Sequence, residues 1–433
     1  MGRVENYLLG MDCGTTNIKA IILSEDGTVV AEAGKPSRFL VPGPNMQEQD
    51  ATQWWDNTVD IFRTLTEKAG KEVVKRIRGI SVSSHTVTML PVDANGNPLR
   101  NALTYQDNRS AAELHYIVDQ VGFNRFVSIV GGQPAVAFLP NKILWFKKNE
   151  PELFAKTACF LQATPASPRR LRPVAYMDAI ASLHPATTGI PAARPVALAA
   201  SSVTNPMISS TSCGFGSTSF KFTPITSPIS SDQSMALISR HAAAHEKNIY
   251  TYLNELALES APGSNGLFFF PYLLGERAPL WNEYARGMFI GMDMDMKRSD
   301  LIRSVFEGTA YALRHVMETV KASGAKAKVL RICGGGAKSR TWSQIKASML
   351  HMPVYLLDEK SGDVPVGDAL IVGHKVGVFP DLTKAVEQIV KVNEIIQPVD
   401  EWVEAYDRLY PFYVDMYQHL DKDLKRLKEV MEI

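Results

Sequence analysis

The sequence has little cysteine, and the four cysteines that it has are spread over a chain of 433 residues. They stand at positions 13, 159, 213 and 333, and no two of them form a CxxC pair. Structural zinc sites and disulfide frameworks need clustered cysteines, so the sequence gives no sign of either. Scattered cysteines are typical of a protein from a reducing compartment.

Long apolar runs and an excess of one charge are also missing. No run approaches the ~20 apolar residues of a membrane-spanning helix, and the N-terminal MGRVENYLLGMD lacks the apolar core of a signal peptide. The formal net charge of +1 argues against a nucleic acid or an anionic membrane as the main partner. We therefore expect a cytoplasmic protein that binds neither, with a homodimer as one option for its assembly.

Two common nucleotide-binding signatures are absent. The Walker pattern GxxxxGK[ST] does not occur, and GGGAKS at 334–339 places Ser339 where the dinucleotide fingerprint needs glycine. This stretch nevertheless follows the apolar run Val329–Cys333 and precedes a predicted helix, Thr341–His351. Its glycines can let a nucleotide approach the backbone near a helix N-terminus. The alternative is a tight strand–helix turn that needs glycine for its own geometry.

The most informative stretch is YLLGMDCGTTNIKAIILSEDGTVVAEA, residues 7–33. Three apolar runs are separated by polar turns, and Asp26-Gly27 is a strong hairpin signal. Asp12 and the polar turn 14–17 therefore join two antiparallel strands. A carboxylate at a strand end can hold hydrated Mg²⁺, and backbone N–H groups with threonine hydroxyls can wrap a phosphate. An ordinary hairpin with a polar turn is the alternative.

Further polar residues follow the predicted strand Val74–Val82, and others stand in the predicted loop Leu103–Arg109 before the helix Ser110–Val121. The polar clusters in these places stand where α/β proteins put ligand contacts, so His85, Gln106, Asp107 and Arg109 could face a polyhydroxyl ligand. Asp107 and Arg109 could equally form a structural ion pair.

Apolar spacing and capping residues predict several helices. Asp50 is the expected N-cap of the first, Ser299-Asp300 cap a long helix from Leu301, and Pro411 is expected to kink or interrupt the last. The first of these helices is Ala51–Lys68 and the last is Trp402–Met431, and the sequence also predicts Ser110–Val121, Pro140–Glu150, Gly367–Val376 and Ala385–Val392.

Residues 164–245 differ from the rest of the chain. This stretch is rich in Ala, Ser, Thr, Pro and Arg, contains only two acidic residues, Asp178 and Asp232, and shows neither a helical nor a strand period. Alone it predicts a linker or a disordered insert. The sequence on both sides indicates α/β structure, so we predict two domains, 1–247 and 248–433.

Several segments resemble the FGGY family of carbohydrate kinases. Residues 287–292 and 300–307 fit the second signature of that family at every constrained position, with seven residues between them. GMDCGTTNIKA resembles its first phosphate loop, EQDATQWW its EQDPxxWW element, and ICGGGAKSRTWSQIKASML its adenosine-binding strand, loop and helix. The first signature is matched loosely at Ala137–Asn149. The resemblance covers 1–163 and 248–433 and is nearest to xylulokinase-like pentulose kinases.

The resemblance implies an α/β protein of two actin-like ATPase (ribonuclease H-like) domains, with a nucleotide cleft between them for ATP, Mg²⁺ and a sugar. Carried over by position, Asp12 positions Mg²⁺. The implied phosphate contacts are Gly14, Thr15, Thr16, Asn17 and Lys19. The implied adenosine contacts are Gly334, Gly335, Gly336 and Ser339, and the implied sugar contacts are His85, Thr86, Asp107 and Arg109.

The general base of the family is not found. It is an Asp that precedes a Gly-Thr-Ser type of turn, which Gly216–Ser219 resembles, but Pro195–Asn205 before that turn contains no carboxylate. The missing Asp aligns near Ser202. Asp232 is a fallback, although it follows the turn instead of preceding it.

Three functions stay open. The first is an ATP-dependent sugar kinase, with a pentulose such as xylulose as its substrate. The second is a catalytically impaired pseudokinase of the same fold that binds sugar or nucleotide. The third is an actin-like or chaperone-type ATPase that needs no sugar.

We predict that 164–245 is translated out of frame, with an accompanying deletion, between two in-frame halves, because the shortfall in length and the missing base both fall there. Reading the gene in the other two frames tests this prediction. An acidic residue near position 202 is expected in one of them. If neither frame contains it, the stretch is a natural insert.

Overall fold

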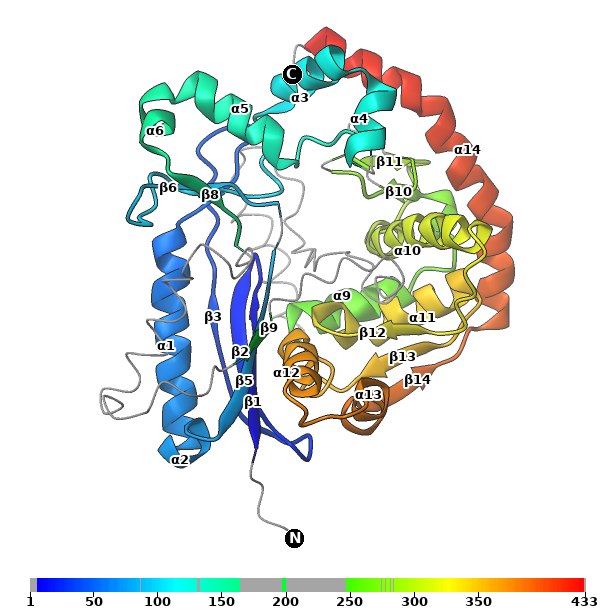
Figure 1. Ribbon diagram of the computed structural model, residues 1–433. Helices are drawn as coiled ribbons and strands as arrows, with labels where there is room; N and C mark the ends of the chain where they lie inside the picture. Colours follow the sequence, from blue (N-terminus) through cyan, green and yellow to red (C-terminus); the bar gives the residue numbers. More distant parts are fainter. Residues whose placement is uncertain are drawn as a thin grey trace. The chain divides into compact units, whose positions relative to one another are not determined.

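The computed structural model describes residues 6–85, 87–130, 133–163, 197–199, 247–273, 275–276, 278–280, 282 and 284–431. They form two compact units (Figure 1). The first contains the described residues up to 199 together with 360–391, and the second contains 247–359 and 392–431. The predicted boundary at 247/248 borders on undescribed residues and stays a prediction. Residues 360–391, which we placed in the second domain, pack with the first unit.

The first unit is built on the predicted hairpin. Its elements are β1 (Tyr7–Cys13), β2 (Asn17–Ser24), β3 (Val29–Pro36), β4 (Glu48–Gln49), α1 (Ala51–Ala69), α2 (Lys71–Val74), β5 (Ile77–Ser84), β6 (Leu90–Val92), β7 (Ala102–Leu103), α3 (Ala111–Val121), α4 (Phe123–Val130), α5 (Leu139–Asn149), α6 (Pro151–Lys156), β8 (Cys159–Leu161), β9 (Ala197–Ala199), α12 (Val364–Lys375) and α13 (Leu382–Ile389).

The main sheet has the strand order β3-β2-β1-β5-β9. β1, β2 and β3 are antiparallel neighbours, whereas β5 is parallel to β1 and β9 is parallel to β5. This register places Asp12 opposite Lys19 on β2 and opposite Ser83 on β5. Three polar residues from three strands therefore meet at one end of the sheet.

Helices cover both faces of this sheet. Leu9, Met11 and Cys13 alternate toward the face that α1 covers, and they form a core with Ile61 and Phe62 of that helix. Leu8 points to the opposite face, where it packs with Ile21 and Leu23 of β2 against α12 and α13. Figure 1 shows α1 and α12 on opposite sides of the strands.

α12 lies very close to β1. A Cβ atom built on Gly10 would stand 1.8 Å from the carbonyl oxygen of Pro365 and 2.8 Å from the amide nitrogen of Ala369. Real Cβ atoms do not approach backbone so closely, so only glycine admits the helix here. Asp12 follows Gly10 on the same face of the strand. The helix therefore passes next to Asp12.

The second unit has an aromatic core. Six tyrosines and two phenylalanines from β10, α10, α14 and the loop after β10 pack together with small and aliphatic residues of α10 and α11. Its elements are α9 (Ile249–Leu258), η1 (Ser264–Gly266), β10 (Phe268–Phe270), β11 (Met288–Ile290), α10 (Arg298–Ala322), β12 (Leu330–Ile332), η2 (Gly335–Lys338), α11 (Arg340–Leu350), β13 (Val354–Leu357), β14 (Val392–Ile396) and α14 (Asp400–Met431). β12 and β13 are parallel, and β14 is antiparallel to β13.

Local signals gave most helices within a few residues, and the structure corrects four details. Asp50 caps α1 as predicted. α12 begins at Val364, three residues before the predicted start, because Asp363 is its N-cap. Lys297, not Ser299-Asp300, stands at the N-cap of α10, and the Asp300 carboxylate accepts a hydrogen bond from its backbone N–H. Val392 belongs to strand β14, not to a helix, and α14 continues through Pro411.

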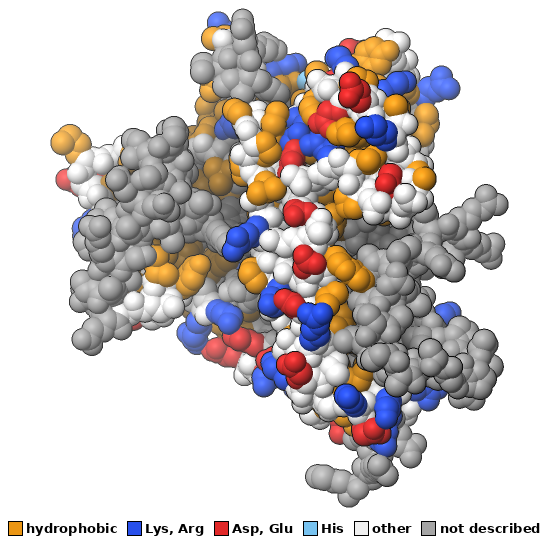
Figure 2. Space-filling view, turned by 90° about the vertical axis from the view of Figure 1, so that its left-hand side faces the viewer, with side chains coloured by type: hydrophobic (Ala, Val, Ile, Leu, Met, Phe, Trp, Pro, Cys, Tyr) orange, Lys and Arg blue, Asp and Glu red, His pale blue; other side chains and the backbone are white. Residues whose placement is uncertain are grey.

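No helix among the described residues is both long enough and apolar enough to cross a membrane. On the face shown in Figure 2, lysine and arginine side chains alternate with acidic ones over the coloured surface. The expectation that the main partner is neither a nucleic acid nor a membrane stays a prediction.

We expect Gly10→Ala to destabilise the protein by at least about 1–3 kcal/mol, because the new methyl group forces α12 away from β1. The midpoint of urea unfolding measures this change. Gly367→Ala is the control: Gly367 is an exposed residue of α12 with nothing within 4 Å of an added Cβ. That substitution should raise stability by up to about 1 kcal/mol. Equal stability of Gly10→Ala and the parent protein would refute the close packing.

Candidate active site

The turn between β1 and β2 presents open backbone donors. Within the part of the chain that the structure describes, the N–H groups of Gly14, Thr15 and Thr16 donate to no acceptor, whereas the carbonyl oxygens of Thr15 and Thr16 are both taken. A Cβ on Gly14 would lie 2.8 Å from the carbonyl oxygen of Asn17, so the turn is tight. Successive free N–H groups in a tight turn can bind an anion such as a phosphate.

Asp12 stands at the start of this turn and is largely buried. The pKa of its carboxyl is raised from 3.8 to about 6, and burial is the largest cause. The charge of Asp363 also raises this pKa, whereas the Ser83 hydrogen bond and the charge of Lys19 lower it. The Ser83 Oγ lies 3.3 Å from Asp12 Oδ1. Lys19 Nζ lies 2.8 Å from Asp363 Oδ2 in a half-exposed ion pair. The predicted metal residue and the predicted phosphate lysine are therefore neighbours.

A second carboxylate, Asp368 of α12, lies behind Asp12. It is 4% exposed, and its Oδ2 lies 2.7 Å from the Ser83 Oγ. The pKa of Asp368 is raised to about 7, and burial is the largest cause. The charge of Asp12 also raises this pKa, whereas hydrogen bonds from Ser83 lower it. One serine hydroxyl thus stands between the partly buried carboxylate of Asp12 and the buried one of Asp368.

These residues fit a nucleotide-bound Mg²⁺ ion. In the described ranges, no group of three or more His, Cys, Asp or Glu side chains could hold a metal by itself. Mg²⁺ does not require such a group, because it keeps several waters and is commonly held by one or two carboxylates together with substrate phosphates. Asp12, next to N–H groups that can bind those phosphates, matches this requirement.

His85 presents an unpaired acceptor. Its Nδ1 lies 3.0 Å from the carbonyl oxygen of Cys13, so this nitrogen carries the hydrogen. Burial lowers the pKa of His85, which keeps the ring neutral. Its buried Nε2 has no partner among the described residues and retains its lone pair. Such an atom can accept a hydrogen bond from a ligand hydroxyl. Thr86, the predicted neighbour in the sugar pocket, lies outside the described residues.

Asp107 and Arg109 are tied to each other. The side-chain nitrogens of Arg109 lie 2.7–3.0 Å from the Asp107 oxygens, and its Nη2 lies 2.8 Å from Glu48 Oε1. Asp107 is fully buried and accepts a hydrogen bond from the backbone N–H of Gln47. The Arg109 guanidinium also stacks on Trp145 at 4.9 Å. These contacts match the structural ion pair, and direct sugar contact stays a prediction.

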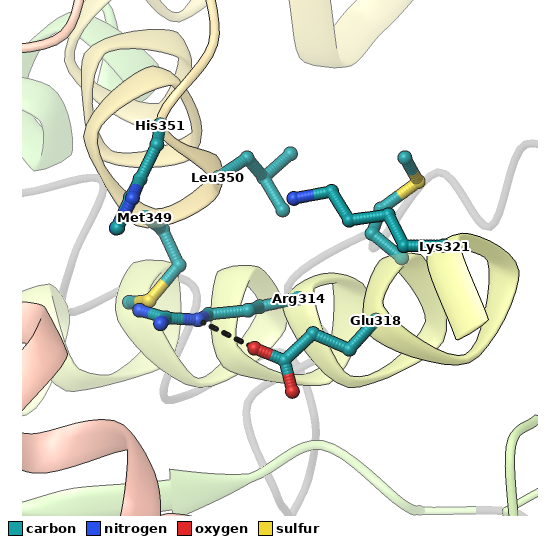
Figure 3. Close-up of a pocket in the computed structure, with 7 residues that line it drawn as sticks. Arg314, Glu318, Lys321, Met349, Leu350 and His351 are labelled. Carbon is teal, nitrogen blue, oxygen red and sulfur yellow. Dashed lines mark hydrogen bonds and ion pairs between the residues drawn. The ribbon is translucent and has the colours of Figure 1, made fainter. Parts of the chain in front are cut away.

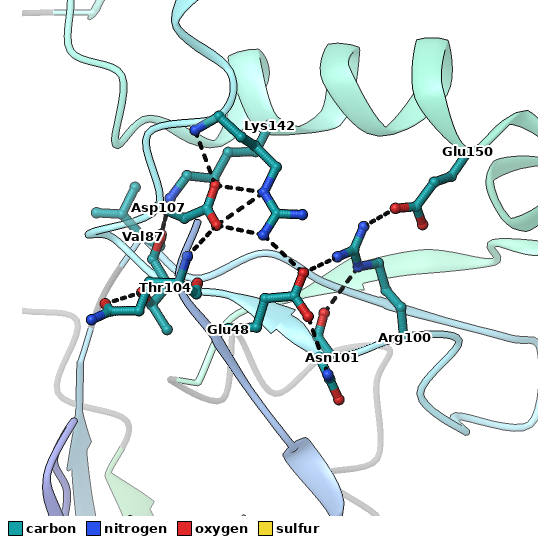
Figure 4. Close-up of polar contacts among 10 residues, drawn as sticks. Glu48, Val87, Arg100, Asn101, Thr104, Asp107, Lys142 and Glu150 are labelled. Carbon is teal, nitrogen blue, oxygen red and sulfur yellow. Dashed lines mark hydrogen bonds and ion pairs between the residues drawn. The ribbon is translucent and has the colours of Figure 1, made fainter. Parts of the chain in front are cut away.

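A wider charged network surrounds this pair (Figure 4). Arg100 bridges Glu48 and Glu150, and Lys142 of α5 donates to the backbone carbonyls of Val87 and Thr104. Lys142 is fully buried. It ties the loop after β5, which contains His85, to the loop after β7, which contains Asp107.

Gln49 connects the same region to the phosphate turn. It is 1% exposed, and its Nε2 donates to the carbonyl oxygen of Thr15 over 2.7 Å. Its neighbours Gln47 and Glu48 hold Asp107 and Arg109, as described above. Three consecutive residues at β4 thus link the predicted sugar side to the predicted phosphate side within the first unit.

In the second unit, the glycine-rich loop adjoins a pocket of about 230 Å³. The pocket lies where the parallel strands β12 and β13 end, and Gly334, Leu356 and Asn393 are among its lining residues. A Cβ on Gly334 or Gly335 would meet nothing within 4 Å, so a ligand can approach this backbone. Gly336 instead packs on Trp342. Ser339 caps α11 and bonds to Asn254.

A second pocket of the same unit is much smaller, about 40 Å³ (Figure 3). Arg314, Glu318 and Lys321 of α10 and His351 after α11 line it. A volume of this size has room for a few water molecules, whereas small-molecule sites typically measure ~300–1,000 Å³. None of the predicted site residues lies there.

The sequence alone did not identify Ser83, Asp363 and Asp368 as site residues. Asp363 and Asp368 lie about 350 residues after Asp12, so no local spacing connects them. One signal was present: in VPVGDALIVG, Asp368 is a charged residue within an apolar Ala/Gly-rich run. A charged residue is rarely buried unless it is paired with another group or serves a function.

An antiparallel hairpin followed by parallel strands, with a carboxylate and an anion-binding turn at the end of the first strand, defines the two-domain ATPase class of α/β proteins. The comparisons with known proteins identify the group within this class. Residues 7–165 match the N-terminal domain, and residues 232–375 the C-terminal domain, of the FGGY family of carbohydrate kinases. The chain belongs to this family.

Relatives and solved structures agree with this assignment. The xylulose kinase of Bacillus subtilis is 26% identical in an alignment 494 positions long, gaps included, that covers 96% of this chain and 98% of that protein. The gluconokinase of the same organism is 23% identical and covers 98% of both. The crystal structure of xylulose kinase from Rhodospirillum rubrum matches with a TM-score of 0.71 and 22% identity, over 97% of this chain and 100% of that chain. The predicted xylulokinase-like sugar kinase is thereby confirmed.

Most of the unusual segment 164–245 lies between the two family matches, whereas residues 164–165 and 232–245 fall inside them. Residues 166–231 belong to neither. Asp232, the fallback for the general base, is the first residue of the second match, but it lies outside the described residues. The origin of 164–245 and the identity of the base stay predictions.

We expect Asp368→Asn to change the pH dependence of stability. Because the pKa of Asp368 is raised from 3.8 to about 7, the folded protein binds more protons than the unfolded chain between these values, and stability falls as pH rises through this window. The variant, which cannot ionise, should exceed the parent by about 1–3 kcal/mol at pH 8 and lose this advantage near pH 4. Urea unfolding in EDTA measures both. An advantage that does not vary with pH contradicts the prediction.

Proposed function

We propose that this protein transfers the γ-phosphoryl group of ATP to a hydroxyl of a sugar or polyol, and that the substrate is a pentulose such as xylulose. The observation that carries the proposal is the turn after β1, where Asp12 stands beside the N–H groups of Gly14, Thr15 and Thr16, which donate to no acceptor among the described residues. Phosphoryl transfer depends mainly on positioning and on neutralising charge, and this turn can contribute to both.

On the nucleotide side, Asp12 holds Mg²⁺, and the phosphates lie against the N–H groups and hydroxyls of the turn, with Asn17 and Lys19 as further contacts. When bound, Mg²⁺ neutralises negative charge on the phosphates. Lys19 is paired with Asp363 at 2.8 Å, and it can turn to a phosphate because the pair is half exposed. Gly334, Gly335, Gly336 and Ser339 serve the adenosine part.

On the sugar side, the His85 Nε2 accepts a hydrogen bond from a substrate hydroxyl, with Thr86 beside it. Asp107 and Arg109 act there by ordering the loop after β7, as their buried ion pair suggests. SSHTVTM at 83–89 is similar to the sugar-binding element of xylulokinases without reproducing it, and xylulose kinases stand among the matches. The gluconokinase match makes an aldonate the second candidate substrate.

The residue that removes the proton from the acceptor hydroxyl is not assigned. A missing base costs roughly 10²–10⁴-fold in rate, which corresponds to about 3–5 kcal/mol of barrier. A chain without it is therefore expected to be slow, not inert. The matches to sugar kinases give no support to the catalytically impaired alternative.

The test is ADP release from MgATP with a panel of pentuloses, polyols and aldonates. We expect turnover that depends on a sugar, with xylulose among the best substrates. Asp12→Asn should lower kcat by about 10²-fold or more, because it removes the charge that holds the cation. Asp26→Asn, an exposed aspartate in the next turn of the same hairpin, is the matched control and should leave turnover unchanged.

The other outcomes identify the alternatives. ATP hydrolysis that is independent of any sugar would favour the ATPase function. If the protein binds sugar or nucleotide but forms no product with any sugar of the panel, the impaired pseudokinase is favoured. Preference for gluconate over every pentulose would replace the proposed substrate but keep the proposed reaction.

A further inference from the structure

Asp368 has no role in the function proposed above, yet its surroundings are unusual. It lies on α12 and is 4% exposed, and among the described residues it forms no ion pair. The hydrogen bonds that favour its ionised form all come from Ser83. A buried carboxylate without a cationic partner costs stability, so its presence points to a purpose other than stability.

Ser83 connects this carboxylate to Asp12. Its Oγ lies 2.7 Å from Asp368 Oδ2 and 3.3 Å from Asp12 Oδ1. A serine hydroxyl has one hydrogen, so it can donate to only one carboxylate at a time. When the Ser83 hydroxyl donates its hydrogen to Asp12, the Ser83 oxygen can only accept a hydrogen bond from Asp368. In that arrangement the Asp368 carboxyl is the donor. The three groups then form one chain, from Asp368 through Ser83 to Asp12.

Direct contact between Asp368 and a bound cation is less consistent with the structure. Asp368 is almost fully buried, and Asp12 is the more exposed of the two carboxylates. The Asp368 carboxylate is directed to Ser83. It is placed on α12, and that helix is fixed against β1 by the contact between Pro365 and Gly10. Asp368 therefore provides a rigid support behind Asp12.

We propose that Asp368 is a positioning residue for Asp12: through the hydroxyl of Ser83 it holds the Asp12 carboxylate in the orientation that binds Mg²⁺. This inference rests on the proposed function, because it concerns the cation of that reaction. Partners that orient a metal ligand commonly change metal affinity by ~10–100-fold when they are removed. The effect should appear in cation binding even where no sugar is turned over.

The test measures binding of Mn²⁺ to the full-length protein in the presence of ADP, by electron paramagnetic resonance of free Mn²⁺. Ser83→Ala and Asp368→Leu should each weaken binding about tenfold. The double variant should be no weaker than either single variant, because both substitutions break the same chain. Asp368→Asn should stay within about threefold of the parent, since its amide can still donate to the Ser83 oxygen.

Asp381→Asn is the matched control. Asp381 is an exposed residue of the same 360–391 segment and caps α13, a position that asparagine also fills well. Circular dichroism establishes that each variant is folded. If Asp368→Leu does not fold, the nearly isosteric Ser83→Ala and Asp368→Asn decide the question.

Three results would overturn the inference: parental affinity in Ser83→Ala, Asp368→Asn as weak as Asp368→Leu, or additive losses in the double variant. The second would mean that the charge of Asp368 itself binds the cation. Failure of the proposed function looks different. In that case the parent protein binds no Mn²⁺ with ADP, and Asp12→Asn has no effect on binding.

Discussion

The contact between Gly10 and Pro365 is the constraint on which the candidate site depends. It brings the backbone of α12 against β1 at a distance that only glycine permits. The same helix carries Asp368 to Ser83, and its N-cap Asp363 reaches Lys19. Residues 360–391, which stand in the sequence between two segments of the second unit, thus complete the site of the first. The chain folds into two units, but it cannot be cut into two consecutive halves without dividing this site.

Burial gives the site its electrostatic character. It raises the pKa of Asp12 to about 6 and that of Asp368 to about 7, because a charged carboxylate is poorly solvated there. The positive charge of Lys19 lowers the pKa of Asp12, whereas the negative charge of Asp363 raises it. The site therefore carries more acidic groups than nearby positive charge can balance. A cation bound at Asp12 would supply that charge, so the proposed cation site agrees with the low exposure of the carboxylates.

The sequence could predict what local patterns determine. The turn chemistry of Asp26-Gly27 predicts the hairpin, and Asp50 predicts the start of α1, because both act within a few residues. Asp368 could not be placed, since its partner Ser83 is 285 residues away in the chain. For Asp107 and Arg109, the residue types fit a sugar contact and an ion pair equally well. Their burial and their bonds to Glu48 and Gln47, which only the fold supplies, favour the ion pair.

The buried charges around β4 are better explained by positioning than by stability. A buried ion-pair network gains little over apolar packing of the same volume, since the desolvation of each charge offsets the attraction. Here the network fixes geometry: Glu48 holds Arg100 and Arg109, while the adjacent Gln49 holds the carbonyl oxygen of Thr15. Apolar side chains could fill the same space without setting the distance between the loop after β7 and the phosphate turn. A phosphoryl-transfer enzyme depends on that distance, because misplacement of reacting groups by about 1 Å can cost ~10²-fold in rate.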